Sequence, residues 1–140
     1  MTFIAGPAPL VVDASVVVDL LAEGDEAIAA RWREWSAEGR LLIAPPFLWL
    51  EIANALLRSK RLPPAIVASH LEGFEASGIE TADRGPAGVR ASLDLAERHG
   101  LTVYDAAYLW LAIDVDGELA TRDRALIRAA EAEKVPLALA

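Results

Sequence analysis

Four acidic residues lie far apart in the chain but at positions from which they could act together: Asp13, Glu51, Asp105 and Asp123. Asp13 and Asp123 follow short apolar runs typical of strands, and Glu51 and Asp105 lie on helical segments that are otherwise apolar. Carboxylates gathered in one place repel one another and are costly to bury, so they usually hold a divalent cation. These residues therefore point to metal-dependent hydrolysis of a phosphodiester bond.

Small polar side chains accompany two of the carboxylates. Ser15 follows Asp13 by two residues, and Thr121 precedes Asp123 by two residues. In such turns a hydroxyl can support the neighbouring carboxylate or contact a phosphate oxygen. Asp13, Ser15 and Asp123 could equally be helix N-caps, whose side chains accept a hydrogen bond from the first helical turn. Taken singly, each residue leaves both interpretations open.

Glu51 belongs to a polar stripe on an apolar helix. The segment 46–58, PFLWLEIANALLR, is apolar nearly all round, which predicts a largely buried helix. Glu51, Asn54 and Arg58 stand at i, i+3 and i+7 and share one face of it. We expect that face to meet a site or an interface. A solvated stripe without chemistry is the alternative.

Asp105 heads a second apolar helix, in the run Tyr104-Asp105-Ala106-Ala107-Tyr108. As an N-cap, Asp105 would be satisfied locally. Because the helix is apolar on every side, we expect its first turn to lie deep in the structure. A helix N-terminus also favours a negative charge, which would help this carboxylate stay ionised for a metal ion.

Basic residues close to the acidic ones in sequence are candidates for phosphate contacts, and runs of charge on a solvated face are the alternative. These basic residues are Arg58, Lys60, Arg61, Arg122 and Arg124.

Several other chemistries are excluded. The chain has no cysteine, which rules out thiolate zinc sites, disulfides and thiol catalysis. His70 and His99 have no recognisable serine or cysteine partner for a triad, and no glycine-rich phosphate loop is present. Oxygen ligands without histidine or cysteine favour Mg²⁺ or Mn²⁺ over zinc.

Length and charge bound the remaining possibilities. At 140 residues, the chain is predicted to form a single domain spanning 1–140. Its net charge of −8 argues against nucleic-acid binding through a broad basic face and suits a basic protein partner.

The four tryptophans are many to hide in one core, so we expect some apolar surface to be shared with another chain. No signal peptide or membrane-spanning stretch is recognisable, so a cytoplasmic protein is expected.

The elements that must position these residues alternate along the chain. Short apolar runs predict strands at 10–12, 41–44, 79–81, 118–121 and 135–139. Helices are expected at 15–21, 25–37, 46–57, 64–76, 86–99, 105–114 and 123–134. Gly24 is expected to end the first of these helices, and Asp25 to cap the second. This alternation predicts an α/β fold, a three-layer α/β/α sandwich around a parallel sheet. Ligands of such sheets bind beyond the carboxyl ends of the strands, where Asp13 and Asp123 are expected.

Four blocks of the sequence resemble the signature blocks of PIN-domain proteins, most closely the VapC-type toxins of bacterial toxin–antitoxin pairs. They are Asp-Ala-Ser at 13–15, Pro46 with Glu51-Ile-Ala-Asn54, Tyr104-Asp-Ala-Ala-Tyr108-Leu and Leu119-Ala-Thr-Arg-Asp123-Arg-Ala-Leu126. The resemblance covers essentially the whole chain and implies a PIN-like sandwich, a Mg²⁺- or Mn²⁺-dependent endoribonuclease, a homodimer, and inhibition by a VapB-like antitoxin. By position, Asp13, Glu51, Asp105 and Asp123 match the acidic quartet, and Ser15, Thr121 and Asn54 match its polar companions. Asp19 departs from the basic or apolar residue that many relatives carry there.

Within this resemblance we expect Asp13 and Asp105 to be the principal metal ligands, with Glu51 and Asp123 completing the shell or positioning water. Two alternatives remain. One is a PIN-like binding module without catalysis, and the other is a metal-dependent DNA nuclease or phosphatase on the same scaffold.

Overall fold

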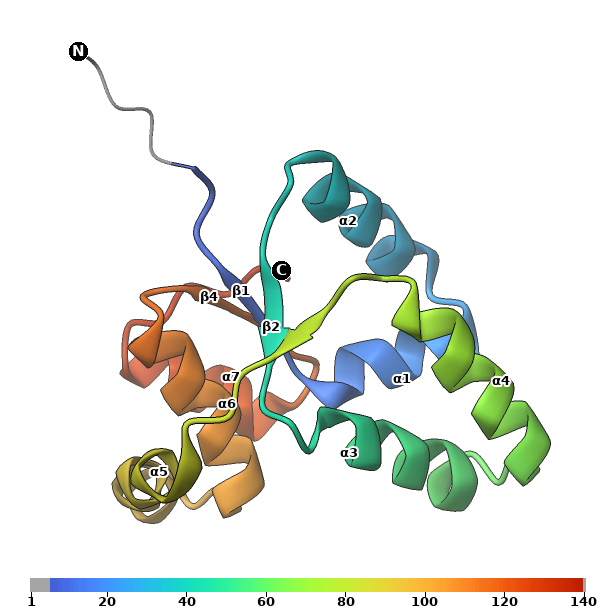
Figure 1. Cartoon of the computed structure of the whole chain (residues 1–140). Coiled ribbons are helices and arrows are strands. Elements are labelled where there is room, and N and C mark those ends of the chain that lie inside the picture. The colour runs from blue at the N-terminus through green and yellow to red at the C-terminus, as the bar shows by residue number, and fades with distance from the viewer. Residues whose placement is uncertain (1–5, 140) are drawn as a thin grey trace.

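A parallel sheet of four strands forms the centre of the molecule, in the order β3-β2-β1-β4. The computed structural model describes residues 6–139, so both ends of the predicted domain 1–140 lie outside the described residues. The strands are β1 (Leu10–Val12), β2 (Leu42–Ala44), β3 (Glu80–Thr81) and β4 (Glu118–Ala120). Every residue of β1 is fully buried, because helices cover both faces of the sheet. The predicted three-layer α/β/α sandwich is therefore confirmed (Figure 1).

The order of the strands reverses beside β1. The chain runs outward from β1 to β2 and β3, and then returns to place β4 on the other side of β1. In the register of the sheet, Leu10 lies opposite both Leu42 and Glu118. Open α/β sheets bind ligands at such a reversal, beyond the carboxyl ends of the strands. Asp13 and Thr121, each directly after its strand, lie at this point.

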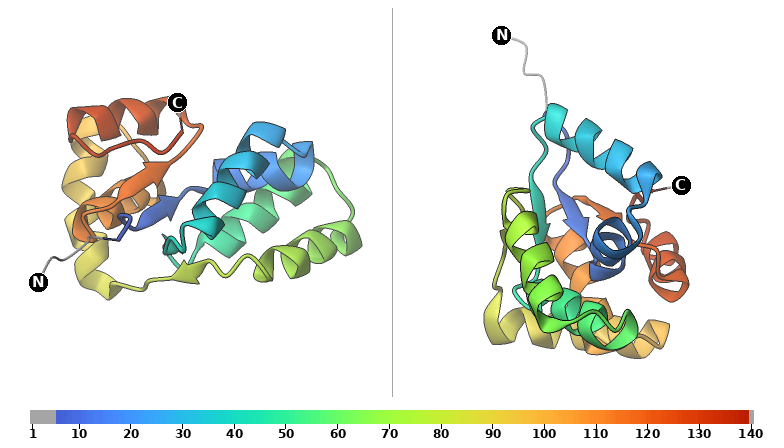
Figure 2. Two further views of the ribbon diagram at one scale, coloured as in Figure 1. Left: turned by 90° about the horizontal axis from the view of Figure 1, so that it is seen from above. Right: turned by 90° about the vertical axis from the view of Figure 1, so that its right-hand side faces the viewer.

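Helices connect and flank the strands. They are α1 (Ala14–Glu23), α2 (Glu26–Ala37), α3 (Leu48–Asn54), the π-helical segment η1 (Ala55–Ser59), α4 (Pro64–Glu75), α5 (Gly85–His99), α6 (Val103–Asp114) and α7 (Arg124–Ala132). Helices α5 to α7 gather on one side of the strands and α1 to α4 on the other (Figures 1 and 2). No helix among residues 6–139 is both long enough and apolar enough to cross a bilayer.

Short polar residues and one glycine set the ends of several helices. Asp25 begins α2, where its carboxylate accepts a hydrogen bond from the Ile28 N–H at 3.1 Å. Gly24 ends α1 in the left-handed conformation that glycine adopts without strain (φ 57°). Both signals were predicted from the sequence, although α1 is longer than the expected 15–21.

The predicted final strand, 135–139, is wrong. Only one isolated parallel bridge forms there, between Leu119 and Leu137. The Pro136 carbonyl accepts from the Leu119 N–H, and the Ala138 N–H donates to the Leu119 carbonyl, both at 2.9 Å. Proline has no N–H to donate, so the pairing cannot extend along the segment.

Two helices expected to be buried all round are only partly so. In α3 the side chain of Leu50 is 74% exposed, and in α6 that of Tyr104 is 59% exposed. Helix α6 also begins two residues earlier than expected, at Val103, and its first turn is only partly buried: Val103 and Tyr104 are exposed, whereas Ala106 is buried. The apolar residues on these outer faces are not covered by any part of the chain that the structure describes.

The tryptophans contribute to the packing between helices. Trp32 and Trp35 are buried, and Phe74 of α4 lies edge-on between Trp32 and Trp49, with ring centroids 5.5 and 5.4 Å apart. The large exposed apolar side chains are instead Leu41, Leu50, Ile66, Val89, Leu93, Val103, Tyr104 and Ile113. If apolar surface is shared with another chain, these residues rather than the tryptophans supply most of it.

Candidate active site

The four carboxylates identified from the sequence line one open cavity of about 450 Å³, which lies beyond the carboxyl ends of β1 and β4. Asp13 and Asp123 come from the ends of β1 and β4, Glu51 from α3 and Asp105 from the first turn of α6. Ser15 and Asn54 also line this cavity. Asp19, which was not among the predicted ligands, lines it as well and adds a fifth carboxylate.

Asp13 lies deepest in the cavity and is held by two hydroxyl groups. Its side chain is only 5% exposed, and its Oδ2 accepts hydrogen bonds from Thr121 Oγ1 at 2.6 Å and from Ser15 Oγ at 2.8 Å. Burial, followed by the charges of Asp105 and Asp123, raises the pKa of Asp13 despite these hydrogen bonds. No hydrogen bond from residues 6–139 reaches Oδ1, which leaves that oxygen free for a ligand.

Asp123 both caps a helix and lines the cavity. Its Oδ1 accepts from the Leu126 N–H at 3.0 Å, which starts α7, and its own N–H donates to Thr121 Oγ1 at 3.0 Å. Ser15 Oγ in turn accepts from the Arg122 N–H at 3.0 Å. The capping role left open by the sequence is therefore present, and it orients the carboxylate toward its neighbours without excluding a second role.

Asp105 is not the N-cap of α6. Thr102 takes that place, and its Oγ1 accepts from the Asp105 N–H at 3.1 Å. The Asp105 carboxylate lies within the first helical turn, where the helix dipole favours a negative charge. Partial burial and the nearby charge of Asp123 nevertheless raise the pKa of Asp105.

Glu51 is half-buried and is held by a tyrosine that the sequence analysis did not single out. The Tyr108 hydroxyl donates to Glu51 Oε1 at 2.7 Å, and Tyr108 itself is fully buried. Burial, followed by the charges of Asp13 and Asp105, raises the pKa of Glu51, while the hydrogen bond from Tyr108 lowers it. A tyrosine on an apolar helix needs a partner for its hydroxyl, and that was the available signal.

The predicted stripe of Glu51, Asn54 and Arg58 holds only in part. Asn54 lies at the rim of the cavity, but Ser59 and Lys60 line it where Arg58 was expected. The reason is the π-helical turn η1, which contains more residues than an α-helical turn and therefore rotates later side chains around the axis. Arg58 is exposed and does not line the cavity.

The basic candidates divide into two groups. Lys60 lines the cavity, with its Nζ 2.6 Å from Glu23 Oε1, and Arg122 lies beside Ser15 with a guanidinium nitrogen 3.2 Å from Asp25 Oδ2. Arg58, Arg61 and Arg124 are exposed and contribute nothing to the lining of this cavity.

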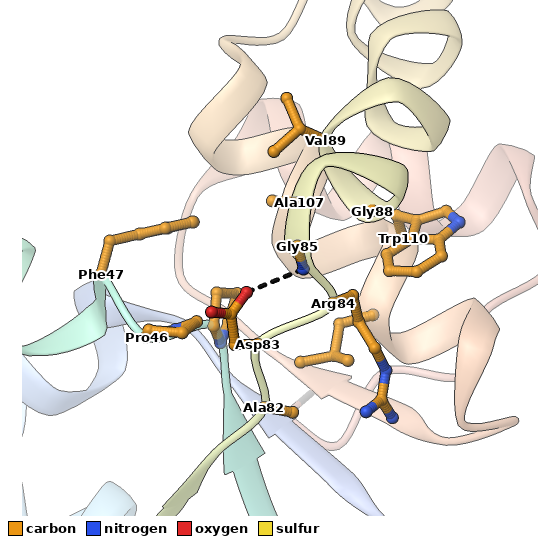
Figure 3. A pocket seen from close by; sticks show the side chains of 12 residues that line it. Pro46, Phe47, Ala82, Asp83, Arg84, Gly85, Gly88, Val89, Ala107 and Trp110 are labelled. Carbon is orange, nitrogen blue, oxygen red and sulfur yellow. Dashed lines mark hydrogen bonds between the residues drawn. The ribbon is translucent and has the colours of Figure 1, made fainter.

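A smaller cavity of about 120 Å³ lies between the end of β3, α5 and α6 (Figure 3). Apolar side chains such as Phe47 and Trp110 form much of its wall. Its one carboxylate, Asp83, accepts a hydrogen bond from the Gly85 N–H at 2.8 Å, and Arg84 is paired with Asp114. No polar group there resembles the carboxylate cluster, so the larger cavity is the candidate active site.

The donor atoms of the larger cavity fit a hard divalent cation. All are oxygens. Burial, and after it the neighbouring negative charges, raises the pKa values of Asp13, Glu51 and Asp105, and a bound cation would offset those charges. Among residues 6–139, however, no three histidine or acidic side chains stand close enough to form a ready-made metal site. An ion would therefore have to draw at least one of these carboxylates toward the others as it bound.

Comparison with known proteins agrees with this architecture. The sequence model of the PIN domain matches residues 10–132, and no curated protein matches the chain. The crystal structure of PAE2754 from Pyrobaculum aerophilum is similar, with 29% identity and a TM-score of 0.65, over 89% of this chain and 82% of that one. VapBC2 from Rickettsia felis, solved bound to a DNA fragment from its promoter, has 16% identity and a TM-score of 0.66, over 93% and 94% of the two chains. At that identity the second likeness concerns the fold alone.

Proposed function

This chain belongs to the PIN-domain family, and from that premise we propose that it is a Mg²⁺- or Mn²⁺-dependent endoribonuclease of the VapC type. Proteins of this family are generally nucleases. The observation that carries the proposal is the convergence of Asp13, Glu51, Asp105 and Asp123, from four separate elements, on one solvent-open cavity. A cavity with several carboxylates suits chemistry on a phosphodiester because a bound cation lets it receive a negatively charged substrate.

Asp13 and Asp105 are proposed as the principal metal ligands, with Glu51 and Asp123 completing the set. A bound Mg²⁺ or Mn²⁺ would acidify the attacking water, orient it in line with the phosphate and offset charge on the leaving oxygen. Ser15 and Thr121 hold Oδ2 of Asp13, so its free Oδ1 points to a fixed place. Asp123 is oriented by its helix-capping bond.

Lys60 and Arg122 are the proposed contacts for the RNA backbone, since Lys60 lines the cavity and Arg122 precedes Asp123, with its backbone N–H donating to Ser15. Each is paired with an exposed or half-buried acidic residue, and such solvent-exposed pairs contribute little to stability. A phosphate group can therefore replace Glu23 or Asp25 at little cost. Arg58, Arg61 and Arg124 stand farther out and would contact only a longer RNA.

We propose a VapB-like antitoxin as partner because α4 is bordered by two apolar grooves. One, of about 420 Å³, lies between α3 and α4 and is lined by residues such as Leu50, Leu57 and Leu71. The other, of about 430 Å³, lies on the side of Trp32 and Phe74. The name of the similar structure, VapBC2, includes both VapB and VapC.

A homodimer and a cytoplasmic location complete the proposal. Exposed apolar residues on neighbouring helices, Val89 and Leu93 of α5 and Val103 and Tyr104 of α6, offer a surface for a second copy.

The test compares substrates and metals side by side. Purified protein is incubated with RNA, single-stranded DNA or a chromogenic phosphate ester, in the presence of Mg²⁺, Mn²⁺ or EDTA. We expect internal cleavage of RNA alone, abolished by EDTA and reduced at least about 100-fold by Asp105→Asn. The matched control is Asp94→Asn, an exposed carboxylate on α5. Cleavage of DNA or of the ester instead would show that the protein is a DNA nuclease or a phosphatase. RNA binding without any cleavage would identify a binding module.

A further inference from the structure

The Tyr108 hydroxyl joins the two helices that carry acidic residues into the cavity. Tyr108 stands three residues after Asp105 on α6, and its hydroxyl donates to Glu51 of α3 across a distance of 2.7 Å. The Tyr108 hydroxyl thus links helix α6, which carries Asp105, to the side chain of Glu51 on α3.

An aromatic cluster fixes the position of that phenol. The ring of Phe47, four residues before Glu51, meets the Tyr108 ring edge-on, with centroids 5.5 Å apart and planes at 88°. Phe47 also meets Tyr104 edge-on, at 5.3 Å and 87°. Because Tyr108 is fully buried and its ring is held on α6, its hydroxyl has no freedom to follow Glu51 if that side chain rotates.

The hydrogen bond determines which Glu51 oxygen remains available. Oε1 is occupied by the phenol, and Oε2 receives no hydrogen bond from residues 6–139. A glutamate has three rotatable side-chain bonds, and holding one oxygen removes most of that freedom before any ligand arrives. The cost of ordering Glu51 is therefore met during folding rather than during metal binding.

We propose that Tyr108 is a positioning residue, which holds Glu51 in the orientation that receives the divalent cation. This inference rests on the proposed metal-dependent function and assigns a role to a side chain outside the acidic quartet. Groups that hydrogen-bond to metal ligands typically change metal affinity by about 10- to 100-fold when they are removed.

The experiment compares the only two tyrosines of the chain. Tyr108→Phe removes one oxygen and keeps the ring, and Tyr104→Phe makes the same change one turn away on an exposed side chain. Mn²⁺ affinity of the full chain is measured by isothermal titration calorimetry, and the Tm is measured in EDTA. We expect Tyr108→Phe to bind Mn²⁺ about 10- to 100-fold more weakly, and Tyr104→Phe to bind it like the wild type.

A double-mutant cycle separates positioning from a merely structural role. If Tyr108 acts through Glu51, Tyr108→Phe should cause no further loss of Mn²⁺ affinity in a Glu51→Gln background. Equal affinities of wild type and Tyr108→Phe, or the same loss in both backgrounds, would overturn the role of Tyr108 alone. A wild-type protein that does not bind Mn²⁺ would overturn the proposed function and this inference together.

Discussion

Replacing Asp13 by asparagine removes one negative charge from the most buried part of the cavity while keeping the shape of the side chain. The amide oxygen can accept the hydrogen bonds that Thr121 and Ser15 now donate to Oδ2. Because the pKa of Asp13 is raised despite those bonds, the ionised carboxylate opposes folding at neutral pH. The metal-free Asp13→Asn protein should therefore be more stable than the wild type.

The size of the effect follows from burial and from the size of the chain. An ionised carboxylate costs more to bury than a neutral amide of the same shape, so the variant should gain stability of about 1–3 kcal/mol. For a chain of this length, 1 kcal/mol corresponds to about 3–4 °C in Tm. Saturating metal should reverse the order, since a ligand at about 1,000 times its Kd stabilises the wild type by about 4.1 kcal/mol and the variant lacks a principal ligand.

Differential scanning calorimetry in EDTA and across a Mn²⁺ titration measures both halves of this prediction. Asp94→Asn on α5 is the matched control, since that carboxylate is 78% exposed and should respond to metal like the wild type. A variant that is less stable than the wild type in EDTA would refute the burial argument. A variant that Mn²⁺ stabilises as much as the wild type would refute the assignment of Asp13 as a ligand.

Three further predictions follow from the same geometry. In EDTA, the stability of the wild type relative to Asp13→Asn should fall as the pH rises above about 3.8, the ordinary pKa of an aspartate. The reason is that the folded state holds the Asp13 proton more tightly than the unfolded state does. Urea unfolding at several pH values measures this trend, and a stability difference that does not change with pH would contradict it. Arg40→Met should lower the free energy of unfolding by about 2–4 kcal/mol, because it leaves Glu118 without the buried guanidinium that lies 2.8 Å away. A loss below about 0.5 kcal/mol, measured by urea unfolding, would show that the Arg40–Glu118 pair contributes little. Gly88→Ala should cost about 1–3 kcal/mol, since a Cβ there would stand 2.7 Å from the Cβ of Arg84, the residue before α5, and 3.1 Å from the Trp110 ring of α6. Gly73→Ala, in open space on α4, should instead stabilise the protein by about 0.5–1 kcal/mol. Equal changes in Tm for the two variants would contradict the packing argument.

The arrangement of strands and most helices was predictable from local signals. The apolar run at 10–12, the stop at Gly24 and the cap at Asp25 each depend on neighbouring residues alone, and all three are confirmed. The strand expected at 135–139 failed because a single proline interrupts its pairing. The π-helical turn after Asn54 had no recognisable signal in the sequence.

The site was predictable where the sheet positions it and less so where helices do. Asp13 and Asp123 follow parallel strands, whose carboxyl ends must share an edge, so their proximity follows from the fold class. The bond between Tyr108 and Glu51 depends on how α3 and α6 approach one another, which periodicity does not give. The catalytic roles of the quartet stay predictions, and so do Asn54 and the basic contacts.

The cavity draws its acidic residues from nearly the whole length of the chain, from position 13 to position 123. Asp13 is held by Thr121, which follows a strand made only after some 115 residues have been synthesised. A chain still emerging from the ribosome therefore lacks both the fourth carboxylate and the hydroxyl that orients the first. Translation itself thus delays assembly of the acidic cluster until Asp123 has been made.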